Sequence, residues 1–292
     1  MAKKFNYKKL VKEYLDWVER QTEGIPGFVP VEDIEKIEAI LNESVSEINC
    51  RQLGMLLSYV GTWHYRNGVC LIAAGDVAGW RELHTAARYK YAEIRILCLV
   101  YDQSKNKFLA GYHVPSILFA GVRGLMCMAI GTWEEADWMA RRLSQGRSDG
   151  SIVGWDYSLS VPYLIIALHR YLEGRTDVGD LELGVYKSVF EHWDDMEGLK
   201  KTLLDLADYH VDNIRGLTKT RVGEFSGPPV DIFPAEMVAI RRVRERLGLE
   251  TPAIDHPLMQ TPFADPPRDI LSESDDLLDR ALAKVRTIIP DL

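Results

Sequence analysis

Apolar side chains recur every three or four residues along most of the chain, which is the spacing of amphipathic helices. In the first such segment, residues 7–22, one face is formed by Tyr7, Leu10, Val11, Tyr14, Trp17 and Val18. The same spacing predicts helices over residues 31–43, 46–66, 77–103, 115–130, 132–145, 158–173, 180–193, 196–214, 234–248 and 277–289. Alternation of apolar and polar residues, which indicates strands, is nearly absent. The pattern therefore predicts an all-α protein.

Glycines mark the expected reversals between helices. Gly75, Gly131 and Gly174 each stand between two helical segments, where glycine ends a helix in the left-handed conformation. The Asn67-Gly68 and Asp149-Gly150 pairs are read as helix ends in the same way. The intervals are too irregular for a strict tetratricopeptide array. We expect irregular antiparallel helical hairpins in a tetratricopeptide-like or α-solenoid-like bundle.

Loops and prolines suggest how the chain is organised. Helical spacing breaks over residues 216–233, and five prolines crowd residues 252–267, so that segment should run extended over the surface. We expect a single helical body over residues 1–292. It comprises an N-terminal helical pair (1–45), a core of helical hairpins (46–215), and a last part (216–292) with a loop, a helix, the proline-rich segment and a docking C-terminal helix.

Composition and charge narrow the classes of function. The 292 residues are 47% hydrophobic, which fits a globular protein. Against 35 Lys and Arg stand 43 Asp and Glu, for a formal net charge of −8. A dedicated nucleic-acid binder usually carries a basic face, so nucleic acid is not an expected partner. An acidic balance fits a protein whose partner is basic.

The sequence predicts a cytoplasmic protein. Charged residues interrupt residues 12–19, where a signal peptide would be apolar. The most apolar run, residues 114–130, contains Arg123 and is short for a membrane span, so we expect a buried helix and no membrane contact. No CxxC motif is present, and buried free thiols are expected at Cys50, Cys70, Cys98 and Cys127.

One stretch has the spelling of a metal-binding motif. Residues 275–279, Asp275-Asp276-Leu277-Leu278-Asp279, match the DDxxD motif with which magnesium-dependent terpene synthases hold diphosphate. The alternative is a helix start in which Ser272 or Ser274 is the cap and the acids occupy the positive first turn. We favour the capped helix, because in those enzymes the motif lies well upstream of the C-terminus.

Other motifs give no support for catalysis. Gly146-Arg147-Ser148-Asp149-Gly150 spells the GxSxG nucleophile elbow, but the elbow needs a preceding strand, so we expect a polar loop between helices. His192 and His210 stand among acidic residues and are read as solvated or core-edge side chains. There is no HExxH, GxGxxG or P-loop motif, so the sequence predicts no catalytic residues, no metal and no cofactor.

Residues 191–212 are strongly acidic, with seven carboxylates against two lysines. One interpretation is a solvated helix face. The other is a docking surface for a basic partner, with Trp193 as an aromatic anchor at its centre. The candidate partner-binding residues are Glu191, Trp193, Asp194, Asp195 and Glu197.

Three stretches together resemble bacterial polymorphic-toxin immunity proteins, specifically the immunity protein 49 family. The first is Gly124-Leu-Met-Cys-Met-Ala-Ile-Gly-Thr-Trp-Glu-Glu-Ala136 with residues 139–142, similar to a segment in which a helix, a glycine and an acidic-Trp-Glu-x-Ala helix follow one another. The second is Tyr163-Leu-Ile-Ile-Ala-Leu-His-Arg-Tyr-Leu-Glu-Gly174. Residues 233–240, 246–248 and 256–259 resemble the closing segment. The resemblance covers residues 50–265.

The resemblance implies a cytoplasmic, non-enzymatic, all-helical protein that binds one cognate toxin and blocks it sterically. It implies a toxin domain acting in the cytoplasm, such as a nuclease or an NAD-consuming enzyme, whose basic residues would pair with acidic side chains. One alternative is a tetratricopeptide-like scaffold that binds peptides or oligomerises. Another is a helical metal-dependent enzyme that uses the carboxylates of residues 275–279. The sequence does not indicate an oligomeric state.

Overall fold

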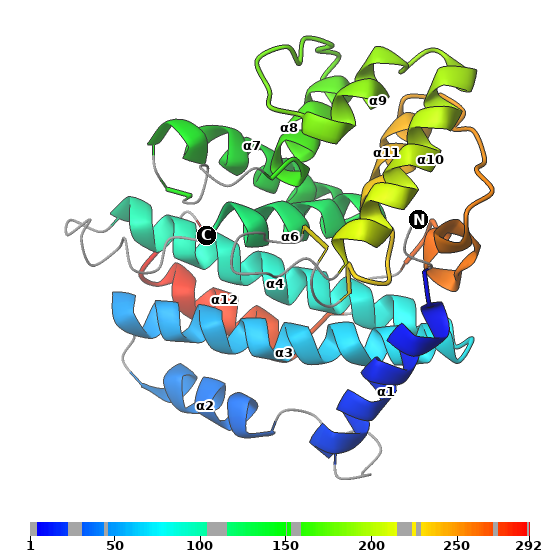
Figure 1. Ribbon diagram of the computed structural model, residues 1–292. Helices are drawn as coiled ribbons and strands as arrows, with labels where there is room; N and C mark the ends of the chain where they lie inside the picture. The colour runs from blue at the N-terminus through cyan, green and yellow to red at the C-terminus, as the bar shows by residue number, and fades with distance from the viewer. Residues whose placement is uncertain are drawn as a thin grey trace. The chain divides into compact units, whose positions relative to one another are not determined.

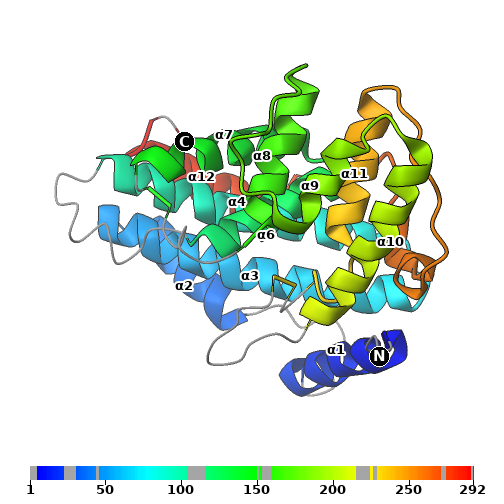
Figure 2. The ribbon, with the colours of Figure 1, turned by 45° about the horizontal axis from the view of Figure 1, so that its top comes forward.

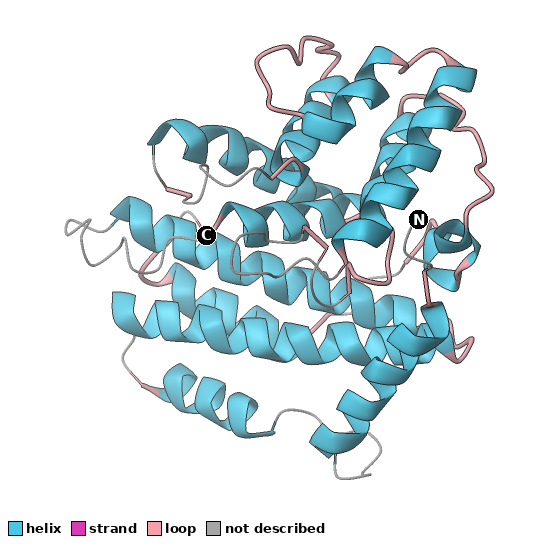
Figure 3. Ribbon diagram, viewed as in Figure 1, coloured by secondary structure: helices cyan, strands magenta, loops and turns pink. Residues whose placement is uncertain are grey.

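The computed structural model describes residues 5–22, 31–43, 46–103, 116–149, 151–152, 159–214, 224–225, 229–270, 274–290 and 292. Within these ranges the chain forms eleven α-helices and three 3₁₀ turns, and no β-strand (Figure 3). The all-α prediction is therefore confirmed. The helices belong to two compact units, and the expected single body over residues 1–292 stays a prediction.

One unit consists of Glu13–Ile117, Gln145–Gly154 and Asp269–Leu292. At its centre lie two long helices, α3 (Glu47–Ala73) and α4 (Ala78–Gln103), which run side by side in opposite directions in Figures 1 and 2. Helices α2 (Val31–Asn42) and α12 (Asp276–Arg286) pack against this pair. Their apolar faces form one core, to which α2 contributes Ile37 and α12 contributes Leu278 and Val285.

Glycines allow α3 and α4 to approach closely. Gly54, Gly61 and Gly68 follow one another at seven-residue intervals on α3 and all face α4. A Cβ atom on Gly68 would lie 2.8 Å from the carbonyl oxygen of Gly79, and one on Gly79 would lie 2.6 Å from the carbonyl oxygen of Gly68. The predicted helix end at Asn67-Gly68 is therefore wrong, because Gly68 is an interhelical contact inside α3. The helix continues to Ala73.

The other unit consists of Met1–Lys12, Leu118–Ser144 and Trp155–Arg268. It holds most of α6 (Ile117–Ile130) and α7 (Trp133–Asp149), together with α8 (Val161–Leu172), α9 (Lys187–Glu191), α10 (Met196–Asn213) and α11 (Ala235–Arg246). Helix α8 is buried on nearly all sides and packs against α11. The first helix, α1 (Tyr7–Thr22), is shared by the two units.

The predicted apolar run 114–130 forms α6, whose C-terminal half is buried as predicted, whereas Phe119 near its start is 58% exposed; residues 114 and 115 lie outside the described residues. Residues Leu125 to Ile130 of α6 are at most 3% exposed. No helix in the described part of the chain combines the length and apolar character that crossing a membrane requires.

The three predicted glycine turns are confirmed. The φ angles of Gly75, Gly131 and Gly174 are 85°, 88° and 75°, in the left-handed region where a side chain is disfavoured. Helix α11 ends in the same way at Gly248, with φ of 74°. Each glycine closes one helix and redirects the chain into the next segment.

Two predicted loop and helix boundaries are wrong. Helix α7 runs past the expected end at residue 145 and stops at Asp149, where the Asp149-Gly150 pair predicted a helix end. Most of the GxSxG spelling is therefore helical rather than a loop, and Gly150 lies outside the described residues. A Cβ atom on Gly146 would meet Ile152 at 2.8 Å, so the glycine makes room for this buried side chain. The helix expected over residues 180–193 is shortened to η1 (Gly184–Tyr186) and α9, since Gly184 adopts a φ of 51°.

The proline-rich segment is also more ordered than an extended surface chain. It contains two 3₁₀ turns, η2 (Pro257–Gln260) and η3 (Pro262–Ala264), each with proline at its start. Proline suits that place because its missing N–H is not needed there. Leu258 and Phe263 are fully buried, and their burial anchors the segment.

Candidate functional site

The predicted acidic residues lie together at the surface where α9 is joined to α10. Glu191, Asp194, Asp195 and Glu197 are all exposed, and we refer to these four residues as the acidic edge. Glu191 is 3.2 Å from Lys187, and Asp195 is 3.3 Å from the Nδ1 atom of His192. Half or more of each of these two carboxylate side chains remains accessible, at 54% and 58%.

Trp193, the fifth predicted residue, lies inside the protein and is only 5% exposed. Its ring stacks on Phe190 with a centroid distance of 5.6 Å and an interplanar angle of 7°. The ring of Tyr171, on α8, lies 4.6 Å away. Trp193 therefore supports the corner between α9 and α10 from within, while the four carboxylates face solvent.

Arg244 ties this corner to α11. Its guanidinium carbon lies 5.0 Å from the Trp193 ring centroid, and its Nη1 atom donates a hydrogen bond to the Trp193 carbonyl oxygen. Its Nε atom donates to the carbonyl oxygen of Glu250 at 3.0 Å. Arg244 is 2% exposed, and burial lowers the pKa of its guanidinium. One buried cation thus connects the acidic edge with the end of α11.

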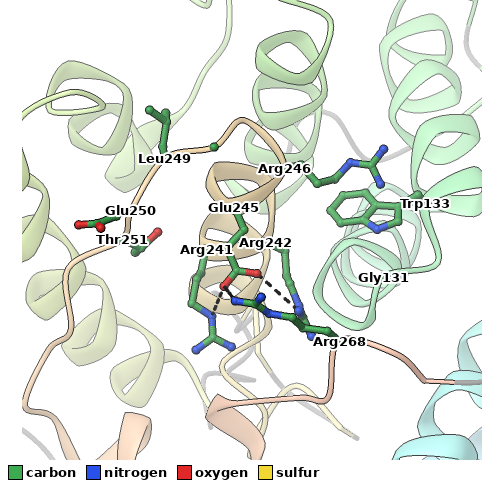
Figure 4. Close-up of a pocket in the computed structure, with 11 residues that line it drawn as sticks. Gly131, Trp133, Arg241, Arg242, Glu245, Arg246, Leu249, Glu250, Thr251 and Arg268 are labelled. Carbon is green, nitrogen blue, oxygen red and sulfur yellow. Dashed lines mark ion pairs between the residues drawn. The ribbon is translucent and has the colours of Figure 1, made fainter.

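A cavity of about 610 Å³ opens on the same helix, and we refer to it as the arginine cavity. Figure 4 shows guanidinium groups from α11 and from the segment after η3 around a single carboxylate, Glu245, with the α7 indole on another wall. The principal lining side chains are Trp133, Arg241, Arg242, Glu245, Arg246 and Arg268. The sequence interpretation missed this site. The sequence feature that could have indicated the cavity is the arginine-rich end of α11, at residues 241–246.

His210, which the sequence predicted to lie in solvent or at the edge of the core, is wholly buried. Its Nδ1 atom lies 2.6 Å from Oε1 of Glu236, and the ring of Phe225 stacks on it at 4.2 Å. His210 and Glu236 are 0% and 1% exposed, so solutes do not reach this pair in the structure. The prediction was wrong because α10 turns this residue toward α11 instead of solvent. His192, with 42% of its side chain exposed, is solvated as expected.

Glu224 is a further buried carboxylate. It accepts hydrogen bonds from the backbone N–H groups of Ser160 and Val161, at the start of α8, and from the Tyr209 hydroxyl at 2.9 Å. The positive helix end favours a carboxylate there. Burial nevertheless raises the pKa of Glu224.

The DDxxD residues are engaged in packing and capping. Asp275 is the N-cap of α12, and its Oδ1 atom accepts from the Leu278 N–H at 3.0 Å and from the Tyr89 hydroxyl at 2.9 Å. The expected serine cap is thus replaced by Asp275; Ser272 lies outside the described residues. Asp279 lies 3.4 Å from Arg88. In the described ranges, no group of three or more His, Cys, Asp or Glu side chains is placed to hold a metal ion.

The four cysteines are free thiols, as predicted. Cys50, Cys98 and Cys127 are buried as predicted, but the predicted burial is wrong for Cys70, which is partly exposed. Burial raises the pKa of Cys70 to about 11 and that of Cys127 to about 12. These two thiols are therefore protonated near neutral pH and weakly nucleophilic.

No protein-family model, no curated protein sequence and no solved structure matches this chain.

Proposed function

We propose that this protein is an immunity protein that binds a cognate toxin domain in the cytoplasm and neutralises it by covering its active site. The observation that carries the proposal is the acidic edge. Its four carboxylates are exposed at the corner between α9 and α10, and the buried Trp193 holds this corner in place. The resemblance to the immunity protein 49 family supports the same function. Steric neutralisation requires a surface and no chemistry, so we propose a protein without enzymatic activity.

The physical support for the contact surface is its charge and its rigidity. Exposed like charges steer a basic partner and raise the rate of association. The buried contacts of Trp193 with Phe190, Tyr171 and Arg244 hold the edge in place before the partner arrives. A preorganised surface loses less conformational entropy on binding. A nuclease or an NAD-consuming toxin, with basic residues for phosphate groups, has the complementary charge.

The second candidate function is a tetratricopeptide-like scaffold that binds extended peptides or a second copy of itself. The antiparallel pair α3 and α4 and the glycine turns at Gly75, Gly131 and Gly174 support it. Such a scaffold would bind several peptides with affinities on the order of micromolar. An immunity protein would instead form one tight complex of fixed stoichiometry.

Co-expression tests the proposal directly. The toxin domain encoded by the neighbouring gene is expressed with and without this protein, and the complex is purified by affinity from surviving cells. We expect survival and a one-to-one complex. Cell death without a complex would contradict the immunity function and favour the scaffold. A catalytically inactive toxin variant serves as the control for expression of both chains.

A further inference from the structure

The arginine cavity has a surplus of positive charge that its own carboxylates do not neutralise. Glu245 is shared by three guanidinium groups, at 3.5 Å from Arg242, 3.7 Å from Arg241 and 3.9 Å from Arg268. These separations are longer than the roughly 2.7–2.9 Å of a charge-assisted hydrogen bond. In Figure 4 the Glu250 carboxylate points away from the group. With Asp265, which pairs with Arg241 at 2.9 Å, two carboxylates therefore face these three cations in a protein of net charge −8.

Two of these arginines are held in place by other contacts. Arg242 is 7% exposed, and its Nη2 atom donates to the carbonyl oxygens of Pro266 and Pro267 at 2.7 and 2.8 Å. Arg241 is fixed by Asp265, at 2.9 Å. The Nε atoms of both arginines are buried and have no hydrogen-bond partner. The cations are thus positioned, and part of their hydrogen-bonding capacity is unused.

The other walls suit a small organic molecule. The guanidinium of Arg246 lies over the Trp133 ring, with its carbon 4.4 Å from the centroid. The Oγ1 atom of Thr251 is buried without a partner. A volume of about 610 Å³ lies within the range of small-molecule sites.

We propose that the arginine cavity binds a small phosphorylated molecule, with its phosphoryl group held by Arg241, Arg242 and Arg268. A carboxylate offers two oxygens and one charge, and Glu245 already shows that one carboxylate does not bring all three guanidinium groups into hydrogen-bond range. A terminal phosphoryl group offers three oxygens and a charge near −2, which matches three forked donors. This inference goes beyond the proposed immunity function and does not depend on it.

Burial supports the assignment. It lowers the pKa of Arg242, which means that the surroundings destabilise the cation more than its carboxylates stabilise it. An arriving anion would restore that balance.

Calorimetric titration of the full chain tests the proposal, with pyrophosphate, AMP, glucose 6-phosphate and citrate as probes. We expect pyrophosphate to bind more tightly than citrate. Tighter binding of AMP would indicate a nucleotide that also contacts Trp133, and tighter binding of glucose 6-phosphate would indicate a sugar phosphate. Absence of binding by all three phosphates, or a preference for citrate, would overturn the assignment.

Three variants separate the cavity from general surface charge. Arg268 is 78% exposed on its side chain, so Arg268→Gln should fold normally and weaken phosphate binding by about tenfold. Glu245→Gln removes the competing carboxylate and should strengthen binding. Arg175→Gln removes a charge from an exposed arginine outside the cavity lining and should leave binding unchanged. Equal losses in Arg268→Gln and Arg175→Gln would overturn the proposed site.

Discussion

The Arg244 guanidinium contacts Trp193 in two ways: it lies over the indole ring of Trp193, and it donates a hydrogen bond to the Trp193 carbonyl oxygen. The contact joins residues 51 positions apart. It fixes the corner between α9 and α10, where the acidic edge lies, to α11. The exposed carboxylates are therefore supported from within by the buried Trp193 ring and the buried Arg244 guanidinium. The acidic edge and the arginine cavity share α11 as a common support.

Loss of the Arg244 contact should loosen this corner. Arg244→Gln is expected to lower the free energy of unfolding by about 2 kcal/mol, because it removes a buried cation–π contact and hydrogen bonds to two carbonyl oxygens. Urea unfolding monitored by tryptophan fluorescence measures the change. Arg246→Gln is the matched control, since Arg246 is exposed and should contribute less than about 1 kcal/mol. Equal effects of the two variants would contradict the role of Arg244.

The glycine contacts between α3 and α4 predict opposite effects of one substitution at two sites. Gly68→Ala should destabilise the protein by about 2 kcal/mol, because its Cβ atom would meet the Gly79 carbonyl oxygen at 2.8 Å. Gly54→Ala should be neutral or stabilise by up to about 1 kcal/mol, since its nearest neighbour is Ile96 at 3.6 Å and alanine favours a helix. Thermal unfolding of both variants checks the pair. A tolerated Gly68→Ala would show that the helices separate easily.

Glu224 should make stability depend on pH. Burial raises its pKa above the ordinary value of 4.5, so the folded state holds a proton where the unfolded state has lost it. Between the pKa of Glu224 in the unfolded state and its higher pKa in the folded state, the free energy of unfolding falls as pH rises. Glu224→Gln removes this titration, so its stability relative to the wild type should grow from about pH 4.5 toward neutral. Chemical denaturation across this range measures it, with Glu250→Gln as an exposed control. A difference independent of pH would contradict the raised pKa.

Asp275 should contribute to stability as a helix cap. Asp275→Ala removes the bond to the Leu278 N–H and the bond from Tyr89, and should cost about 1–2 kcal/mol. Asp276→Ala should change stability by less than about 0.5 kcal/mol, because its side chain is 85% exposed. Unfolding with and without magnesium compares the two. Stabilisation by magnesium that disappears in Asp275→Ala would instead favour the metal-dependent enzyme.

The sequence was sufficient for most helices because their apolar spacing is local. Gly131 and Gly174 were recognisable as turns for the same reason, since a glycine between two periodic segments has a local signature. Gly68 was misread because its role depends on Gly79, on the facing helix. Helix α9 was overestimated because the positive φ of Gly184 interrupts an otherwise regular pattern.

For the candidate sites, too, local features were predictable from the sequence and features set by the tertiary fold were not. Exposure of the acidic edge was predictable, since four carboxylates within seven residues seldom find internal partners. Burial of Trp193 was not, because its partners Tyr171 and Arg244 come from other helices. The arginine cavity requires Trp133, the end of α11 and Arg268 to converge. Only the tertiary fold brings such distant residues together.

We propose above that the acidic edge captures a basic toxin domain. Stopped-flow association at low salt tests it with the double variant Asp194→Lys/Asp195→Lys. The control is Glu35→Lys/Glu43→Lys, which reverses two exposed charges elsewhere. We predict that the first variant associates about tenfold more slowly than the wild type, that the control does not, and that high salt reduces the difference. An unchanged rate for Asp194→Lys/Asp195→Lys at low salt would contradict the claim.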